Sequence, residues 1–108
     1  MDVSKEIASY ITIEDLKNNP LLLEIAENDT TQGIETARNL ILNQGGMQGI
    51  PKINYYKSAI QRFIIANYYE IPTNKMIREL RNVLNINERS IKRIMRDAIN
   101  SQYKKNLK

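Results

Sequence analysis

From Ile77 to Met95 the chain reads I-R-E-L-R-N-V-L-N-I-N-E-R-S-I-K-R-I-M. Apolar residues recur at spacings of three and four on both sides of the segment 85–87, which is the period of amphipathic helices. The pattern therefore predicts two helices, over about 74–84 and 88–103, joined by a short turn. Their inward-facing residues would be Met76, Ile77, Leu80 and Leu84 in the first helix and Ile91, Ile94, Met95, Ala98 and Ile99 in the second.

The residues of the turn suit a tight connection between two helices. Asn85 is expected to have a positive φ, which Asn tolerates better than any residue except Gly. Ile86 would fill the gap between the helices, and Asn87 would cap the second helix with its side-chain oxygen. At the other end of the first helix, Thr73 or Asn74 is the expected N-cap. The sequence thus predicts where both helices begin.

The run 77–95 resembles the helix-turn-helix of DNA-binding proteins, whose pattern is often written I-R-E-L-A-x-x-L-G-V-S-x-x-T-V-x-R-x-L. The resemblance covers about residues 73–99 and is closest to small regulators of the kind that phages and plasmids carry. Arg81 departs from the pattern, because it stands where a small Ala usually lies at the closest approach of the two helices. Unless its side chain points outward, we expect a wider helix crossing than is usual in this family.

In such proteins the second helix enters the major groove with its N-terminal residues against the base edges. The resemblance therefore implies that the helix over 88–103 is a recognition helix and that double-stranded DNA is the ligand. An arginine fork can read guanine bidentately or hold a phosphate. The candidate DNA-binding residues are Asn87, Arg89, Ser90, Lys92, Arg93, Arg96 and Asn100, with Lys75 and Arg78 on the preceding helix.

The rest of the chain also reads as helical. Thr12 and Asp15 have the spacing of a capping box, Asn19-Pro20 that of a helix start, and Gly45–Pro51 forms a strong loop signal. Helices are predicted over about 31–42 and 54–69, with a break at 70–73. The second of these would bury Tyr56, Ile60, Phe63, Ile64 and Asn67.

No segment alternates with the period of a strand, so the predicted fold class is all-α. It comprises a C-terminal trihelical helix-turn-helix unit over residues 51–108 and an N-terminal helical extension over residues 1–50. Two tyrosine pairs, 55–56 and 68–69, flank the helix over 54–69. In each pair one ring is expected to pack and the other to lie at the rim, in preference to stacking on unpaired bases.

Charge is distributed unevenly along the 108 residues. The chain carries a net charge of +4, but residues 1–50 hold eight acidic and three basic residues, whereas residues 71–108 hold ten basic and three acidic ones. A basic C-terminal third favours a polyanion as ligand, and an acidic half favours a protein partner or a merely solvated surface.

Composition also excludes several chemistries. Without Cys or His the chain has no thiol nucleophile, disulfide, zinc finger or imidazole base. The carboxylates of residues 14, 15, 24, 27 and 29 match no calcium loop and are expected to be surface charges. We therefore expect a protein that is not an enzyme and needs no metal or other cofactor.

These observations favour a sequence-specific DNA-binding protein, either a transcription regulator or an accessory factor in replication or partition. A homodimer is expected, because one small unit contacts few bases, and the acidic half would dimerise or recruit a partner protein. The alternative is a helical protein–protein adaptor or inhibitor that does not bind DNA. Neither a targeting signal nor an apolar run that could span a membrane is present, so a cytoplasmic location is expected.

Overall fold

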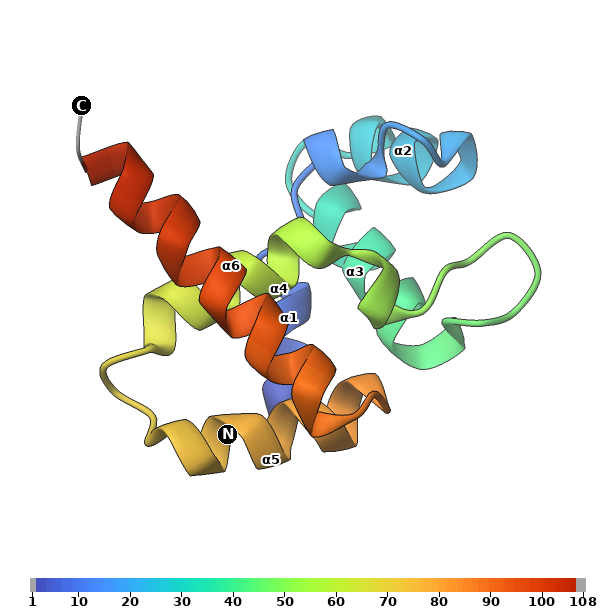
Figure 1. Cartoon of the computed structure of the whole chain (residues 1–108). Coiled ribbons are helices and arrows are strands. Elements are labelled where there is room, and N and C mark those ends of the chain that lie inside the picture. The colour runs from blue at the N-terminus through green and yellow to red at the C-terminus, as the bar shows by residue number, and fades with distance from the viewer. Residues whose placement is uncertain (1, 107–108) are drawn as a thin grey trace. The chain divides into compact units, whose positions relative to one another are not determined.

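The computed structural model describes residues 2–106, and side chains within residues 2–102. Every regular element in this part of the chain is helical, which confirms the all-α prediction (Figure 1). In chain order the elements are α1 (Val3–Ala8), η1 (Glu14–Leu16), α2 (Pro20–Asn28), α3 (Gly33–Gln44), η2 (Ile53–Tyr55), α4 (Lys57–Asn67), α5 (Thr73–Leu84) and α6 (Glu88–Asn106), where η denotes a 3₁₀-helix.

The chain forms two compact units, Met1–Ile60 and Gln61–Lys108, and the division falls inside α4. The predicted boundary at residue 50 lies within the first unit instead. The reason is that the glycine-rich loop folds back on itself and onto its own unit. The Gly46 N–H donates to the Ile50 carbonyl at 2.8 Å, and the Asn19 side-chain amide donates to the Gly49 carbonyl at 2.9 Å.

Helices α2 and α3 pack along each other in the first unit. The predicted start of α2 is confirmed: the Asn19 carboxamide oxygen accepts the Leu22 N–H at 3.1 Å, and Pro20 is the first helical residue. Gly33 begins α3 at a close approach, because a Cβ atom there would lie 2.4 Å from the Ala26 carbonyl oxygen. Any larger residue at position 33 would push the two helices apart.

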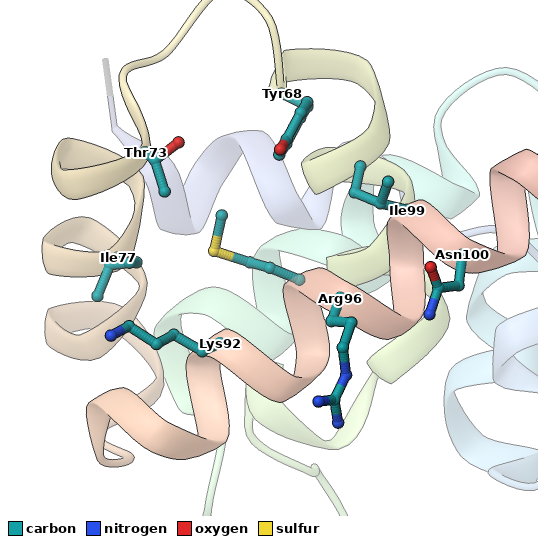
Figure 2. A pocket seen from close by; sticks show the side chains of 8 residues that line it. Tyr68, Thr73, Ile77, Lys92, Arg96, Ile99 and Asn100 are labelled. Carbon is teal, nitrogen blue, oxygen red and sulfur yellow. The ribbon is translucent and has the colours of Figure 1, made fainter.

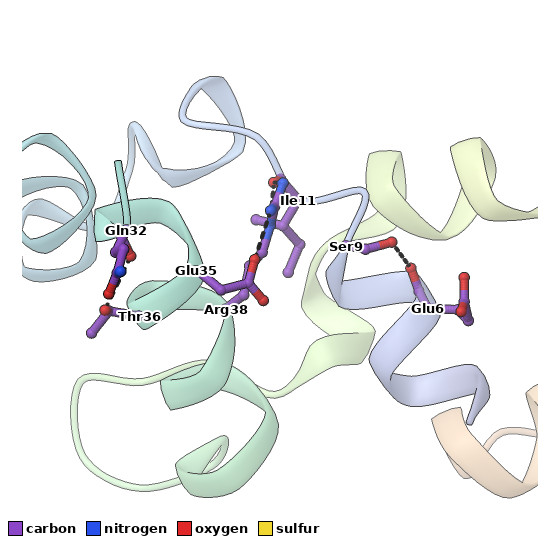
Figure 3. A network of polar contacts seen from close by, with 7 residues as sticks. All are labelled: Glu6, Ser9, Ile11, Gln32, Glu35, Thr36 and Arg38. Atoms are coloured by element: carbon purple, nitrogen blue, oxygen red, sulfur yellow. Dashed lines mark hydrogen bonds and ion pairs between the residues drawn. The ribbon is translucent and has the colours of Figure 1, made fainter. Parts of the chain in front are cut away.

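Helix α1, which the sequence pattern did not single out, also contacts α3. The segment that follows α1 is held to α3 by Arg38, whose Nε and Nη2 atoms donate to the Ile11 carbonyl at 3.0 and 2.7 Å (Figure 3). Glu35 accepts a further bond from the Arg38 guanidinium at 3.2 Å. Ile11 itself is fully buried, so this forked contact satisfies a carbonyl beside the core of the unit.

Several predicted helices begin or end elsewhere because side chains compete for backbone groups. Thr12 and Asp15 do form the reciprocal bonds of a capping box, but the helix that follows them is a single 3₁₀ turn. Helix α3 begins at Gly33 rather than near residue 31, because the Asp29 carboxylate accepts the N–H groups of residues 31 and 32.

The helix predicted over 54–69 is divided in two. Residues 53–55 form η2, and Tyr56, with φ −90° and ψ 71°, interrupts the helix before α4 begins at Lys57. The buried residues are nevertheless the predicted ones, since Tyr56, Ile60, Phe63, Ile64 and Asn67 all have exposed fractions below a tenth.

In the second unit α5 and α6 pack against each other. All four predicted core positions of α5 are buried, as are Ile91, Met95 and Ala98 of α6; Ile94 and Ile99 are only half-buried. The predicted N-cap of α5 was wrong: Thr73 is already helical and Pro72 precedes it without a side-chain cap. Among the described helices, none combines the length and apolarity needed to cross a membrane.

Candidate nucleic-acid interface

The turn between α5 and α6 has the predicted backbone geometry. Asn85 lies in the left-handed region with φ 53° and ψ 45°, and its N–H donates to the Arg81 carbonyl at 2.9 Å. In the described chain it is the only residue other than glycine with a positive φ. The left-handed conformation lets α5 end and the chain reverse within three residues.

Asn87 fixes the start of α6. Its side-chain oxygen accepts the Ser90 N–H at 2.8 Å, as expected for an N-cap. Asn87 is exposed and Ser90 half-buried. The cap uses one lone pair of the Asn87 side-chain oxygen, and the amide nitrogen remains available to donate to a ligand.

The face of α6 opposite its core is cationic. Arg89, Lys92, Arg93 and Arg96 are all exposed, as is Asn100 further along the helix. Residues three and four positions apart lie side by side on a helix, so these four cations form one continuous surface. We call Arg89, Lys92, Arg93 and Arg96 the α6 cationic face.

The members of the α6 cationic face differ in how they are paired. Lys92 Nζ lies 3.3 Å from Glu88 Oε1, and both side chains are more than half exposed. Such an exposed ion pair contributes little to the stability of the fold, and Lys92 can readily exchange Glu88 for another anion. Within the described residues, the arginines of this face have no ion-pair partner. The three guanidinium groups of this face are therefore available to bind an external anion.

Two further predicted residues, Lys75 and Arg78, are exposed on α5. Arg78 lines a polar hollow of about 350 Å³ together with Arg81, Asn82, Asn85 and Ile86. Arg81 is exposed, so the side chain points outward at the position where the family pattern has Ala. Arg81 was not among the residues predicted to bind DNA. Arg78 and Arg81 are three residues apart, which places them side by side on α5.

The α6 cationic face also borders an apolar hollow of about 400 Å³ (Figure 2). Ile77, Met95 and Ile99 supply its apolar surface, and Lys92 and Arg96 contribute two cations. This hollow could not be predicted from the sequence, because its lining comes from three separate segments between Tyr68 and Asn100.

The tyrosine pairs behave as predicted. Tyr56 is buried with only 4% of its surface exposed, whereas Tyr55 is 59% exposed, and the two rings meet edge to face. Tyr68 is half-buried and Tyr69 is 94% exposed.

In the part of the chain that the structure describes, no three acidic residues come close enough to hold a metal ion.

No known family model, curated protein or solved structure matches this chain.

Proposed function

We propose that this protein binds double-stranded DNA through α6, and that α5, the turn and α6 act as a helix-turn-helix. The observation that carries the proposal is the α6 cationic face, which begins at the capped N-terminus of the helix. Three of its four cations have no partner among the described residues. A rigid helix that presents arginines from its first turns is suited to the major groove, which is wide enough to admit it.

The positions of the cations indicate which of them would contact bases and which would contact phosphates. Arg89 and Arg93 are the two arginines nearest the N-terminus of α6, so we assign them to base edges, where a guanidinium can donate to O6 and N7 of guanine. Arg78 and Arg81 lie on α5 beside the turn, and we assign them to phosphates. Phosphate contacts set the register of the protein on the duplex, and base contacts set its sequence preference.

We further propose that the protein acts as a dimer in transcription regulation, or in replication or partition. A single α6 reaches only a few base pairs, and two copies on a repeated or palindromic site would provide the specificity that one lacks. The acidic residues of the first unit would serve a protein contact, with a second copy or with another protein.

The proposal is tested by fluorescence anisotropy with a labelled duplex pool and then with the best selected site. Arg93→Ala should weaken binding to that site by about 1–3 kcal/mol, while the melting temperature stays nearly constant because the side chain is exposed. Lys17→Ala is the matched control. Lys17 is an exposed cation of the first unit, paired with Glu14 at 2.6 Å, so its removal should leave DNA affinity unchanged.

Two outcomes would contradict the proposal. Equal affinity of Arg93→Ala and the parent for the selected site would remove α6 as the reading helix. Weak binding that hardly changes with salt would favour the adaptor function, since a protein that contacts several phosphates loses affinity steeply as salt rises.

A further inference from the structure

The apolar hollow beside α6 has the size and lining of a small-molecule site. At about 400 Å³ it falls within the range of ligand pockets, which are mostly apolar with a few placed polar groups. Ile77 and Met95, with 7% and 6% of their surface exposed, belong to its lining together with the half-buried Ile99. Tyr68, which directly follows α4, and Thr73, the first residue of α5, line it as well (Figure 2).

The charge around the hollow has one sign. Lys92, Arg96 and Asn100 follow one another along α6 at intervals of four residues and all contribute to the lining, whereas no Asp or Glu does. Lys92 would first have to give up its exposed ion pair with Glu88, whereas the Arg96 guanidinium has no ion-pair partner among the described residues. Arg96 can hold a carboxylate through two parallel hydrogen bonds, and the Asn100 amide can donate a further one.

We infer that the hollow binds a small apolar carboxylate, with the hydrocarbon part against Ile77, Met95 and Ile99 and the carboxylate on Arg96. The complementarity has two independent parts, because a neutral apolar compound would leave Arg96 unused and a small polar anion would leave the apolar lining exposed. Only a compound that carries both groups satisfies the whole site.

Such a ligand would also control the proposed DNA binding, and this second step rests on the proposed function. Arg96 and Lys92 belong both to the hollow and to the α6 cationic face. A bound carboxylate neutralises one positive charge of that face and occupies the guanidinium that would otherwise meet a phosphate. Ligand and DNA therefore compete, and by linkage each weakens the binding of the other by the same factor.

The experiment uses the full chain and three probes that share parts of one structure. Octanoate carries both the tail and the charge, butanoate has the same charge with a shorter tail, and 1-octanol has the same tail without the charge. Binding is followed without DNA in two-dimensional ¹⁵N–¹H spectra. We expect octanoate to shift amide signals around residues 73–77 and 92–100, with a dissociation constant of about 1 mM or tighter. Butanoate and 1-octanol should bind at least about tenfold more weakly.

Two exposed arginines of α6 provide matched variants. Arg96→Gln should weaken octanoate binding by about tenfold, whereas Arg89→Gln, which does not line the hollow, should bind octanoate within about twofold of the parent. The site is overturned if octanoate causes no shifts, if 1-octanol binds as well as octanoate, or if both variants lose octanoate equally.

The competition is measured separately by anisotropy. Saturating octanoate should raise the apparent dissociation constant for duplex DNA by about fivefold or more, and butanoate at the same concentration serves as the control for ionic strength. Unchanged DNA affinity with octanoate bound overturns the competition. Because the spectra are recorded without DNA, they decide the carboxylate site whether or not the chain binds DNA.

Discussion

At the scale of single residues, Tyr56 has the most unusual environment. Its hydroxyl is the one buried side-chain polar atom without a hydrogen-bond partner in the described part of the chain. Burial raises its pKa to about 12, and the nearby Tyr55 and Asp15 add to the shift. An unpaired buried hydroxyl loses its hydrogen bonds to water on folding and costs about 1–3 kcal/mol. We therefore expect Tyr56→Phe to stabilise the fold by about 1–2 kcal/mol in urea unfolding at pH 7.

The same substitution should change the response to alkaline pH. The folded-state pKa of Tyr56 lies above the unfolded value of about 10, so the unfolded chain loses the proton first. The contribution to the free energy of unfolding is complete below pH 10 and is lost progressively between pH 10 and 12, by about 2–3 kcal/mol. Tyr56→Phe should lack this loss, whereas Tyr55→Phe, at an exposed ring, should retain it. A parent and a Tyr56→Phe variant with parallel stability curves from pH 9 to 12 would contradict the assignment.

At the scale of elements, the sequence predicted the helices whose apolar stripes are regular. Every predicted core position of the 54–69 segment and of α5 is buried, because burial along a helix follows its period, although the fully buried Ala59 of α4 was not predicted. The predicted start of α3 was wrong because the Asp29 carboxylate accepts backbone N–H groups of the next residues. The predicted start of α4 was wrong because the backbone of Tyr56, with φ −90° and ψ 71°, is not helical. The cationic residues of α6 were also predictable as exposed, since they alternate with its core positions. The apolar hollow was not predictable, because its lining depends on how α5 and α6 pack.

The turn between α5 and α6 gives a sharp test at this scale. Asn85→Gly should be neutral or slightly stabilising, because glycine adopts the left-handed φ of 53° without strain. Asn85→Val should lower the free energy of unfolding by about 1–2 kcal/mol, because a β-branched side chain is strained there. Both variants lose the Asn85 side-chain amide, so the difference between their free energies of unfolding reports the cost of the left-handed backbone conformation. Equal denaturation midpoints for the two variants would exclude a strained turn at Asn85.

At the scale of the whole molecule, the two units carry opposite charge. Residues 1–60 hold eight acidic and five basic residues, whereas residues 61–108 hold four acidic and eleven basic ones. The total of +4 is therefore a poor guide to where an anion binds. If the affinity for DNA depended only on the total charge of the chain, a charge change in either unit would alter that affinity equally. If it contacts the second unit alone, only changes there should alter the contacts that release counterions.

The salt dependence of DNA binding separates these two cases. The logarithm of the binding constant falls with the logarithm of salt concentration, with a slope of about −0.9 for each phosphate contact. Arg78→Gln and Arg81→Gln should each make the slope shallower by about 0.9, because each removes one assigned phosphate contact. Glu24→Gln and Glu27→Gln, at exposed positions on α2, also change the total charge by one but should leave the slope as it is. Anisotropy titrations between about 50 and 200 mM salt measure all four slopes. A slope that shifts as much for the α2 variants as for the α5 variants would mean that DNA senses the net charge of the chain, and the assignment of phosphate contacts to Arg78 and Arg81 would be wrong.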